Sequence, residues 1–235
     1  MQNPIIAALD VPSVEAAKKL IEQIGDRVGA FKVGMELFTA AGPEIIEQIR
    51  RRQASVFLDL KFHDIPNTVA KAVNSAVQLD IQMLTIHTHG GLEMMKAAEE
   101  AAQARAAKLG VDTPLVLGVS VLTSMNQENL TELGIQSSVA DQVQRVVTLG
   151  LKAGLRGFVC SPLEITRLRS FIPPTTKLVT PGIRMATDSK GDQKRTTSPK
   201  EALEMGSDYL VIGRPIYAAP DPAQALESIL ATIAP

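Results

Sequence analysis

The stretch VFLDLKFHDIPNTV (residues 56–69) shows the pattern that decides the fold of this chain. It begins with the apolar run Val56-Phe57-Leu58, which is typical of a strand buried on both of its faces. Charged and polar residues follow at once, and from residue 69 to residue 77 the apolar side chains recur at helical spacing. The stretch therefore predicts a strand and a helix joined by a strongly polar turn.

The same alternation repeats along the whole chain. Short apolar runs are separated by segments whose apolar residues recur at helical spacing. The predicted strands are residues 4–10, 28–34, 55–61, 82–87, 114–120, 156–161, 177–181 and 207–213. Eight strand–helix units in 235 residues predict an α/β fold, a (β/α)8 TIM barrel that forms a single domain over residues 1–235. An open doubly wound sheet is the alternative, but it usually carries a glycine-rich first turn, and residues 10–13 contain no glycine.

The overall composition excludes several classes of protein. Hydrophobic residues make up 45% of the chain and charged residues 21%, which is typical of a globular protein. The net charge of -1 gives no basic surface for nucleic acid or for a membrane. No apolar run reaches transmembrane length, and the first ten residues do not resemble a signal peptide, so we expect a soluble cytoplasmic protein. The single cysteine, Cys160, fits a small core residue better than a nucleophile.

Charged side chains gather where the predicted strands end, which is the active-site face of such a barrel. Asp10 ends the first strand, Lys32 lies in the second, and Asp59 and Lys61 lie in the third. Because side chains alternate along a strand, Asp59 and Lys61 point the same way, into the barrel if the leucines between them face the helices. Buried charges need partners. We therefore expect Lys32, Asp59, Lys61 and a second carboxylate to pair with one another.

Some of these polar residues also have a purely structural interpretation. The buried ion pairs could serve only to fix the barrel, although stabilising features tend to lie at its opposite face. Asp64 could be an ordinary helix N-cap residue, which is compatible with a role in a site. His87 and His89 could hold a metal, but without a third ligand at a recognisable spacing a supporting role is favoured. His63 remains without an assigned role.

Two loops that contain glycine and arginine predict a phosphate site. TPGIR (residues 180–184) follows the seventh predicted strand, and VIGRPI (residues 211–216) includes the end of the eighth. Barrels often bind phosphate with the loops after these two strands. Glycine allows a close backbone approach, and Arg184 and Arg214 can make charge-assisted hydrogen bonds. Residues 182–198 lack a clear periodicity and are expected to form a lid, a binding loop or a disordered segment.

These motifs together resemble a known family. LDLKFHDIPNTV (residues 58–69), FKVG (residues 31–34) and the two glycine–arginine loops resemble the orotidine 5′-phosphate decarboxylases of the bacterial type, over essentially the whole chain. The DxKxxD core alone occurs in a wider superfamily, whereas DIPNTV and the arginine loops are more specific. The resemblance implies a homodimeric lyase that converts orotidine 5′-phosphate to uridine 5′-phosphate and CO₂ in pyrimidine biosynthesis, with no metal and no organic cofactor.

The resemblance also implies roles for individual residues near the reacting bond. Lys61 would donate the proton to C6, and Asp59 would lie beside the carboxylate that is lost. Asp10 and Lys32 would hold the ribose hydroxyls. A cation beside C6 suits this chemistry, because the departure of CO₂ leaves negative charge in the ring plane with no electron sink.

Further positions complete the site that the resemblance implies. The residues that would reach across the dimer into the neighbour's site are Asp64, Ile65 and Thr68, with Asp64 in the catalytic set. The residues that would bind the phosphate are Arg184, Gln193, Gly213 and Arg214, and Gln193 could also bridge to the base. Thr123 would contact the pyrimidine, with Ser124 as the alternative.

Two other functions remain as alternatives. A Mg²⁺-dependent decarboxylase of the same superfamily, acting on a sugar phosphate, would need an extra carboxylate near the end of the second strand. That strand offers Lys32, and Glu36 comes later, which argues against a metal. A non-catalytic phosphate-binding barrel would keep the two arginine loops but would not need buried lysine and aspartate side chains.

Overall fold

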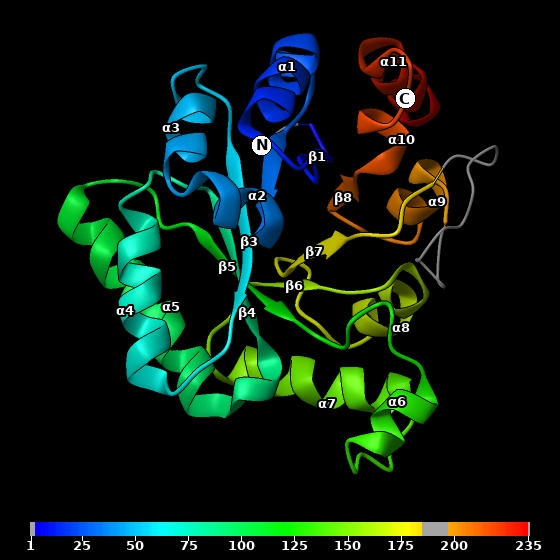
Figure 1. The fold of residues 1–235 in the computed structure, drawn as a ribbon. Coiled ribbons are helices and arrows are strands. Elements are labelled where there is room, and N and C mark those ends of the chain that lie inside the picture. Colours follow the sequence, from blue (N-terminus) through cyan, green and yellow to red (C-terminus); the bar gives the residue numbers. More distant parts are fainter. Residues whose placement is uncertain (1–2, 185–196, 235) are drawn as a thin grey trace.

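The computed structural model describes residues 3–184 and 197–234, and the eight strands in this part of the chain close into a parallel barrel (Figure 1). Each strand pairs with the next one along the chain, and the last pairs with the first. The strands are β1 (Ile5–Ala8), β2 (Ala30–Gly34), β3 (Val56–Phe62), β4 (Met83–His87), β5 (Leu115–Val119), β6 (Gly157–Val159), β7 (Lys177–Thr180) and β8 (Tyr209–Ile212). The predicted TIM barrel is confirmed, and the doubly wound sheet is excluded.

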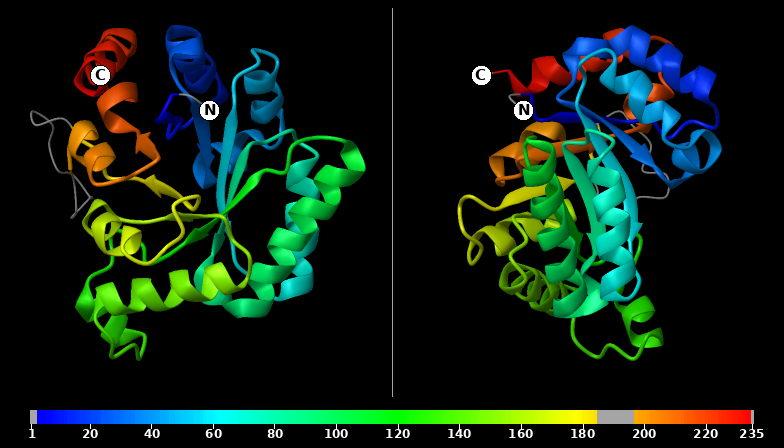
Figure 2. Two further views of the ribbon diagram at one scale, coloured as in Figure 1. Left: turned by 180° about the vertical axis from the view of Figure 1, so that it is seen from behind. Right: turned by 90° about the vertical axis from the view of Figure 1, so that its left-hand side faces the viewer.

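Helices surround the barrel and cover the outer faces of its strands (Figures 1 and 2). They are α1 (Val14–Ile24), α2 (Met35–Ala41), α3 (Glu44–Arg50), α4 (Pro66–Val77), α5 (Gly91–Leu109), α6 (Gln127–Glu132), α7 (Val139–Lys152), α8 (Ile165–Arg169), α9 (Pro199–Glu204), α10 (Arg214–Tyr217) and α11 (Pro222–Ile233), with short 3-10 turns at Gly25–Arg27, Thr88–Gly90 and Pro162–Glu164. Helices α1 and α11, from opposite ends of the chain, pack against each other. Within the described ranges, no helix combines the length and the apolar character that crossing a membrane requires.

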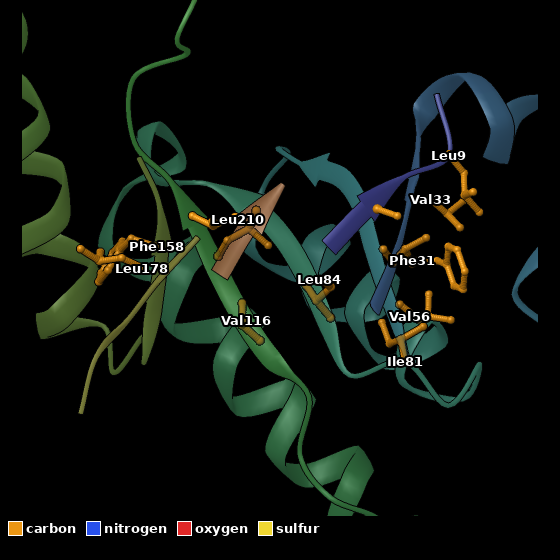
Figure 3. Close-up of a cluster of buried hydrophobic side chains, with 14 of the residues drawn as sticks. Leu9, Phe31, Val33, Val56, Ile81, Leu84, Val116, Phe158, Leu178 and Leu210 are labelled. Carbon is orange, nitrogen blue, oxygen red and sulfur yellow. The ribbon is translucent and has the colours of Figure 1, made fainter. Parts of the chain in front are cut away.

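Two apolar layers fix which way the strand residues point. The inner layer fills the barrel and includes Phe57, while the outer layer lies between strands and helices and includes Leu58. Figure 3 shows part of the outer layer, with Phe31 and Leu84 among the labelled side chains. Burying such a side chain contributes roughly 1.5–3 kcal/mol, so a one-residue slip of β3 would be costly. Because Phe57 points inward and Leu58 points outward, Asp59, which follows them in β3, is directed into the barrel, as predicted.

The start of α4 contradicts the interpretation of Asp64 as a helix N-cap residue. The N-cap residue of α4 is Ile65, with Pro66 at the start of the helix and no side-chain capping bond. Proline disfavours the helical conformation in the residue before it, and Ile65 accordingly has an extended ψ of 151°. Asp64 lies one residue too early, and its Oδ1 accepts a hydrogen bond from the backbone N–H of Ile65 at 2.7 Å. The interpretation of Asp64 as the helix N-cap is therefore wrong.

Strand β3 is irregular at the end that carries Lys61. Leu58 pairs with Leu84 and Phe62 pairs with Ile86, so residues 59–61 of β3 lie opposite Thr85 alone in β4. Lys61 has a φ of 50°, in the left-handed region. This conformation costs a non-glycine residue roughly 1–2 kcal/mol. Bulges of this kind redirect side chains, and they are over-represented next to active sites.

Candidate active site

A pocket of about 600 Å³ opens at the carboxyl ends of the strands, within the size range of ligand sites. Residues from many strands and loops line it, which is how this fold builds a site. The predicted site residues that line the pocket are Asp10, Lys32, Asp59, Lys61, Thr123, Arg184, Gly213 and Arg214. Ser124, the alternative to Thr123, lines it as well. Cys160 is buried, as predicted, and it also contributes to the pocket wall.

Four of these residues form a line of alternating charge, which we call the charged row (Asp10, Lys32, Asp59 and Lys61). Lys32 Nζ lies 2.7 Å from Asp10 Oδ1 and 3.6 Å from Asp59 Oδ2. Lys61 Nζ donates to both oxygens of Asp59, at 2.8 and 2.9 Å. The predicted pairing is confirmed, and Asp10 is the second carboxylate. Lys32 and Asp59 are the buried members of the row, and each can be buried because it has partners of opposite charge.

The environment of Asp59 keeps its carboxyl group ionised. Burial by itself raises the pKa of Asp59, because it penalises the charged form. The charges of Lys32 and Lys61, together with hydrogen bonds from Lys61 and Thr85, outweigh this effect and hold the pKa of Asp59 below its ordinary value. The pocket therefore presents a fixed negative charge directly beside an ammonium group.

Two residues that the sequence did not single out support the charged row. Thr85, fully buried in β4, accepts a hydrogen bond from the backbone N–H of Lys61 and donates one to Asp59 Oδ1, each at 2.9 Å. A Cβ atom at Gly34 would lie 3.1 Å from Lys32 Nζ, so a larger residue would crowd the row. Thr85 could have been found in the sequence as a polar residue in an otherwise apolar strand. It lies two residues after the inward-facing Met83, so it points to the same side of the strand.

Another part of the pocket wall is formed by the two glycine–arginine loops. Arg184 comes from the loop after β7, and Gly213 and Arg214 come from the end of β8 and the start of α10. The backbone N–H of Arg184 donates to Thr197 O at 3.0 Å, so the described residues on either side of 185–196 meet at the rim of the pocket. Gln193, predicted to contact phosphate and base, lies outside the described residues.

Three predicted site residues are not brought into this pocket. Asp64, Ile65 and Thr68 all have exposed side chains at the entry to α4, and none of them contributes to the pocket wall. Ile65 is 67% exposed, which is high for an isoleucine. Within the described part of the chain, none of these three residues is hydrogen bonded or ion paired to the charged row.

The three histidines lie at or just after the carboxyl ends of β3 and β4. The rings of His63 and His87 have centroids 5.4 Å apart, and Gln142 Nε2 lies 3.4 Å from His89 Nε2. Burial, followed by the neighbouring charges of His63 and His89, lowers the pKa of His87 to about 4. His87 is therefore neutral at neutral pH. Across residues 3–184 and 197–234, no three histidine, cysteine or carboxylate side chains are grouped as a metal site.

Known proteins share both the sequence and the fold of this chain. Residues 3–229 match the family described as orotidine 5′-phosphate decarboxylase / HUMPS. An orotidine 5′-phosphate decarboxylase of Moorella thermoacetica is 48% identical over 233 residues, covering 99% of this chain and 92% of the relative. One from Shewanella sediminis is 50% identical over 227 residues, covering 97% and 95%. The crystal structure of orotidine 5′-phosphate decarboxylase from Lactobacillus acidophilus superimposes with a TM-score of 0.88 at 36% identity, covering 100% of both chains. By these similarities, this chain belongs to the orotidine 5′-phosphate decarboxylase / HUMPS family.

Proposed function

We propose that the pocket converts orotidine 5′-phosphate to uridine 5′-phosphate and CO₂, with Lys61 as the proton donor to C6. Curated relatives with this activity share about half of their residues with the chain. The observation that carries the proposal is the charged row, in which Lys61 is hydrogen bonded to both oxygens of Asp59 at the pocket wall. A barrel that only bound phosphate would have no use for this arrangement.

The proposed reaction uses the ammonium group of Lys61 twice. When the bond between C6 and the carboxyl carbon breaks, its electron pair stays on C6 in the plane of the ring. The nearby ammonium stabilises this developing charge and then transfers one proton to C6, leaving a neutral amine that regains a proton from solvent. Asp59 orients the ammonium, and its negative charge repels the substrate carboxylate until CO₂ departs.

The remaining pocket residues would bind the parts of the substrate that do not react. Asp10 and Lys32 would hold the ribose hydroxyls, and Thr123 would contact the pyrimidine. The proposed phosphate-binding residues are Arg184, Gln193, Gly213 and Arg214. The phosphate group is remote from C6. The free energy of binding it would position the reacting end of the substrate and would close the loop of residues 182–198 over the substrate. No step in this scheme requires a metal or an organic cofactor.

We further propose that the active unit is a homodimer in which Asp64, Ile65 and Thr68 of each chain complete the neighbour's site. These residues are exposed and lie outside their own pocket. Exposed apolar side chains follow other strands at the same face of the barrel, including Met35 at 57% and Leu92 at 41% exposure. Burying this face against a second chain would remove these side chains from water.

Decarboxylation by purified protein, followed by ultraviolet absorbance in excess chelator, tests the activity. We expect full turnover of orotidine 5′-phosphate, whereas turnover that disappears with chelator would favour the Mg²⁺-dependent alternative. Lys61→Ala should abolish turnover while uridine 5′-phosphate still binds. Arg214→Ala is the contrasting variant and should weaken binding of that nucleotide. Decarboxylation retained in Lys61→Ala would refute the role assigned to Lys61.

A further inference from the structure

At the bulge in β3 the backbone N–H of Lys61 has a side-chain partner in the neighbouring strand β4. In a regular parallel ladder the residues of an inner strand bond alternately to its two neighbouring strands, and each backbone N–H donates to a backbone carbonyl group. Between the pairs Leu58–Leu84 and Phe62–Ile86 the register shifts, and the N–H of Lys61 donates instead to the side-chain oxygen of Thr85 at 2.9 Å. The Thr85 hydroxyl thus replaces a backbone acceptor at the one residue of β3 that has a positive φ.

The same hydroxyl group also determines the position of Asp59. An ionised carboxylate can only accept hydrogen bonds, so the 2.9 Å contact between Thr85 Oγ1 and Asp59 Oδ1 uses the hydroxyl proton. The hydroxyl oxygen is then left to accept from the N–H of Lys61. Both bonding directions are fixed, because reversing either one would leave two donors or two acceptors facing each other.

These hydrogen bonds form a closed ring that includes the ammonium group of Lys61. From Thr85 the ring passes to the Asp59 carboxylate, from Asp59 to Lys61 Nζ at 2.8 Å, and from the backbone N–H of Lys61 back to Thr85. Thr85 is 0% exposed and Asp59 is 8% exposed, so water does not compete for these bonds at Thr85. A ring of this kind restricts both the backbone and the ammonium group of Lys61.

We propose that Thr85 is a positioning residue for the decarboxylation, whose hydroxyl group fixes the left-handed backbone of Lys61 and the Asp59 carboxylate as one unit. The inference rests on the proposed role of Lys61. Thr85 does not belong to the pocket wall, so it acts through its two partners and not by contact with the substrate. Loss of the hydroxyl should therefore lower kcat and leave substrate binding almost unchanged.

Thr85→Val keeps the shape of the side chain and removes the hydroxyl group, whereas Thr85→Ser keeps the hydroxyl. We expect kcat of Thr85→Val to fall about 100-fold, because a displacement of about 1 Å at a reacting group has an effect of this size. We expect KM for orotidine 5′-phosphate and the affinity for uridine 5′-phosphate to change less than about threefold. Thr85→Ser should restore kcat to within about fivefold of the parent protein.

Thr88→Val is the matched control. Thr88 is also buried, and its hydroxyl donates to the backbone oxygen of Val119 at 2.8 Å and not to a member of the charged row. This variant should lose stability as Thr85→Val does, with kcat within about threefold of the parent. An unchanged kcat in folded Thr85→Val, or an equal fall of kcat in Thr88→Val, would overturn the proposal.

If Thr85→Val does not fold, Thr85→Cys and Thr85→Ser provide the comparison, because a thiol is a much weaker donor and acceptor than a hydroxyl of similar shape. Equal kcat values in these two variants would overturn the proposal, and a lower kcat in the cysteine variant would support it. Turnover by the parent protein, and its loss in Lys61→Ala, test the proposed function separately. A failure of the Thr85 inference alone leaves those two results intact.

Discussion

The left-handed conformation of Lys61 predicts an unusual order of stability between two inactive variants. Lys61→Ala and Lys61→Gly both remove the ammonium group and its hydrogen bonds to Asp59. In the folded state they differ in how well the new residue tolerates a φ of 50°. Alanine retains the clash of its Cβ with the backbone, whereas glycine adopts this region freely. The comparison therefore reports on the backbone strain at this position, together with the greater freedom of glycine in the unfolded chain.

The expected difference follows from two opposing effects. Relief of the left-handed strain favours glycine by roughly 1–2 kcal/mol. The greater freedom of glycine in the unfolded chain favours alanine by about 0.4–1 kcal/mol. From the midpoints of these two ranges, we expect the free energy of unfolding of Lys61→Gly to exceed that of Lys61→Ala by about 0.8 kcal/mol. For a chain of this size, that difference corresponds to a rise of about 1–4 °C in Tm.

Urea unfolding at one fixed protein concentration measures the difference, because oligomer formation makes the apparent stability depend on concentration. The matched control is Lys71, which is exposed in the middle of α4. There Lys71→Ala should be more stable than Lys71→Gly by about 1 kcal/mol, the ordinary order in a helix. If alanine is also the more stable residue at position 61, the strain assigned to Lys61 is refuted.

Two further predictions concern His87 and the second chain. Because the pKa of His87 in the folded protein (about 4) lies below its ordinary value of 6.5, its stabilising contribution is complete above pH 6.5 and is lost as the pH falls toward 4, by about 1–2 kcal/mol after allowance for solvent screening. Urea unfolding of His87→Gln should show a shallower loss of stability over this pH range, and the same slope as the parent would contradict the assignment. For the dimer, Lys61→Ala and Asp64→Asn are each expected to be inactive, but a re-associated equimolar mixture should regain about a quarter of the parent turnover, since each mixed dimer contains one intact site. A mixture that forms mixed dimers by native mass spectrometry and stays inactive would exclude the shared site.

The sequence was sufficient for the architecture because the strands of a closed parallel barrel are apolar on both faces. The alternation of inward and outward residues in β3 also predicted the direction of Asp59. The entry to α4 was less well predicted, although Pro66 carries the needed signal. Proline is favoured at the first helical position, so the N-cap falls on Ile65 and not on Asp64.

The sequence could not predict the contacts of residues whose partners come from another strand or another chain. The roles of Asp64, Ile65 and Thr68 need a second copy, and Gln193 lies outside the described residues. Thr85 is 26 residues from Asp59 along the chain and becomes its hydrogen-bond donor only because β4 lies beside β3. Nothing in the local spacing of either strand specifies this contact.

The contact between Lys61 and Asp59 was predicted correctly from the alternation of side chains, but regular strand geometry does not explain how the two side chains meet. Regular pleating places residues two apart on the same face, about 6–7 Å apart along the strand. The structure instead bulges at residues 59–61 and turns Lys61 into the left-handed region, and its ammonium reaches both oxygens of Asp59. The strain at Lys61 and the ring through Thr85 belong to this departure from regular pleating. A variant that restored the regular strand would therefore be expected to gain stability and to lose the arrangement on which proton transfer depends.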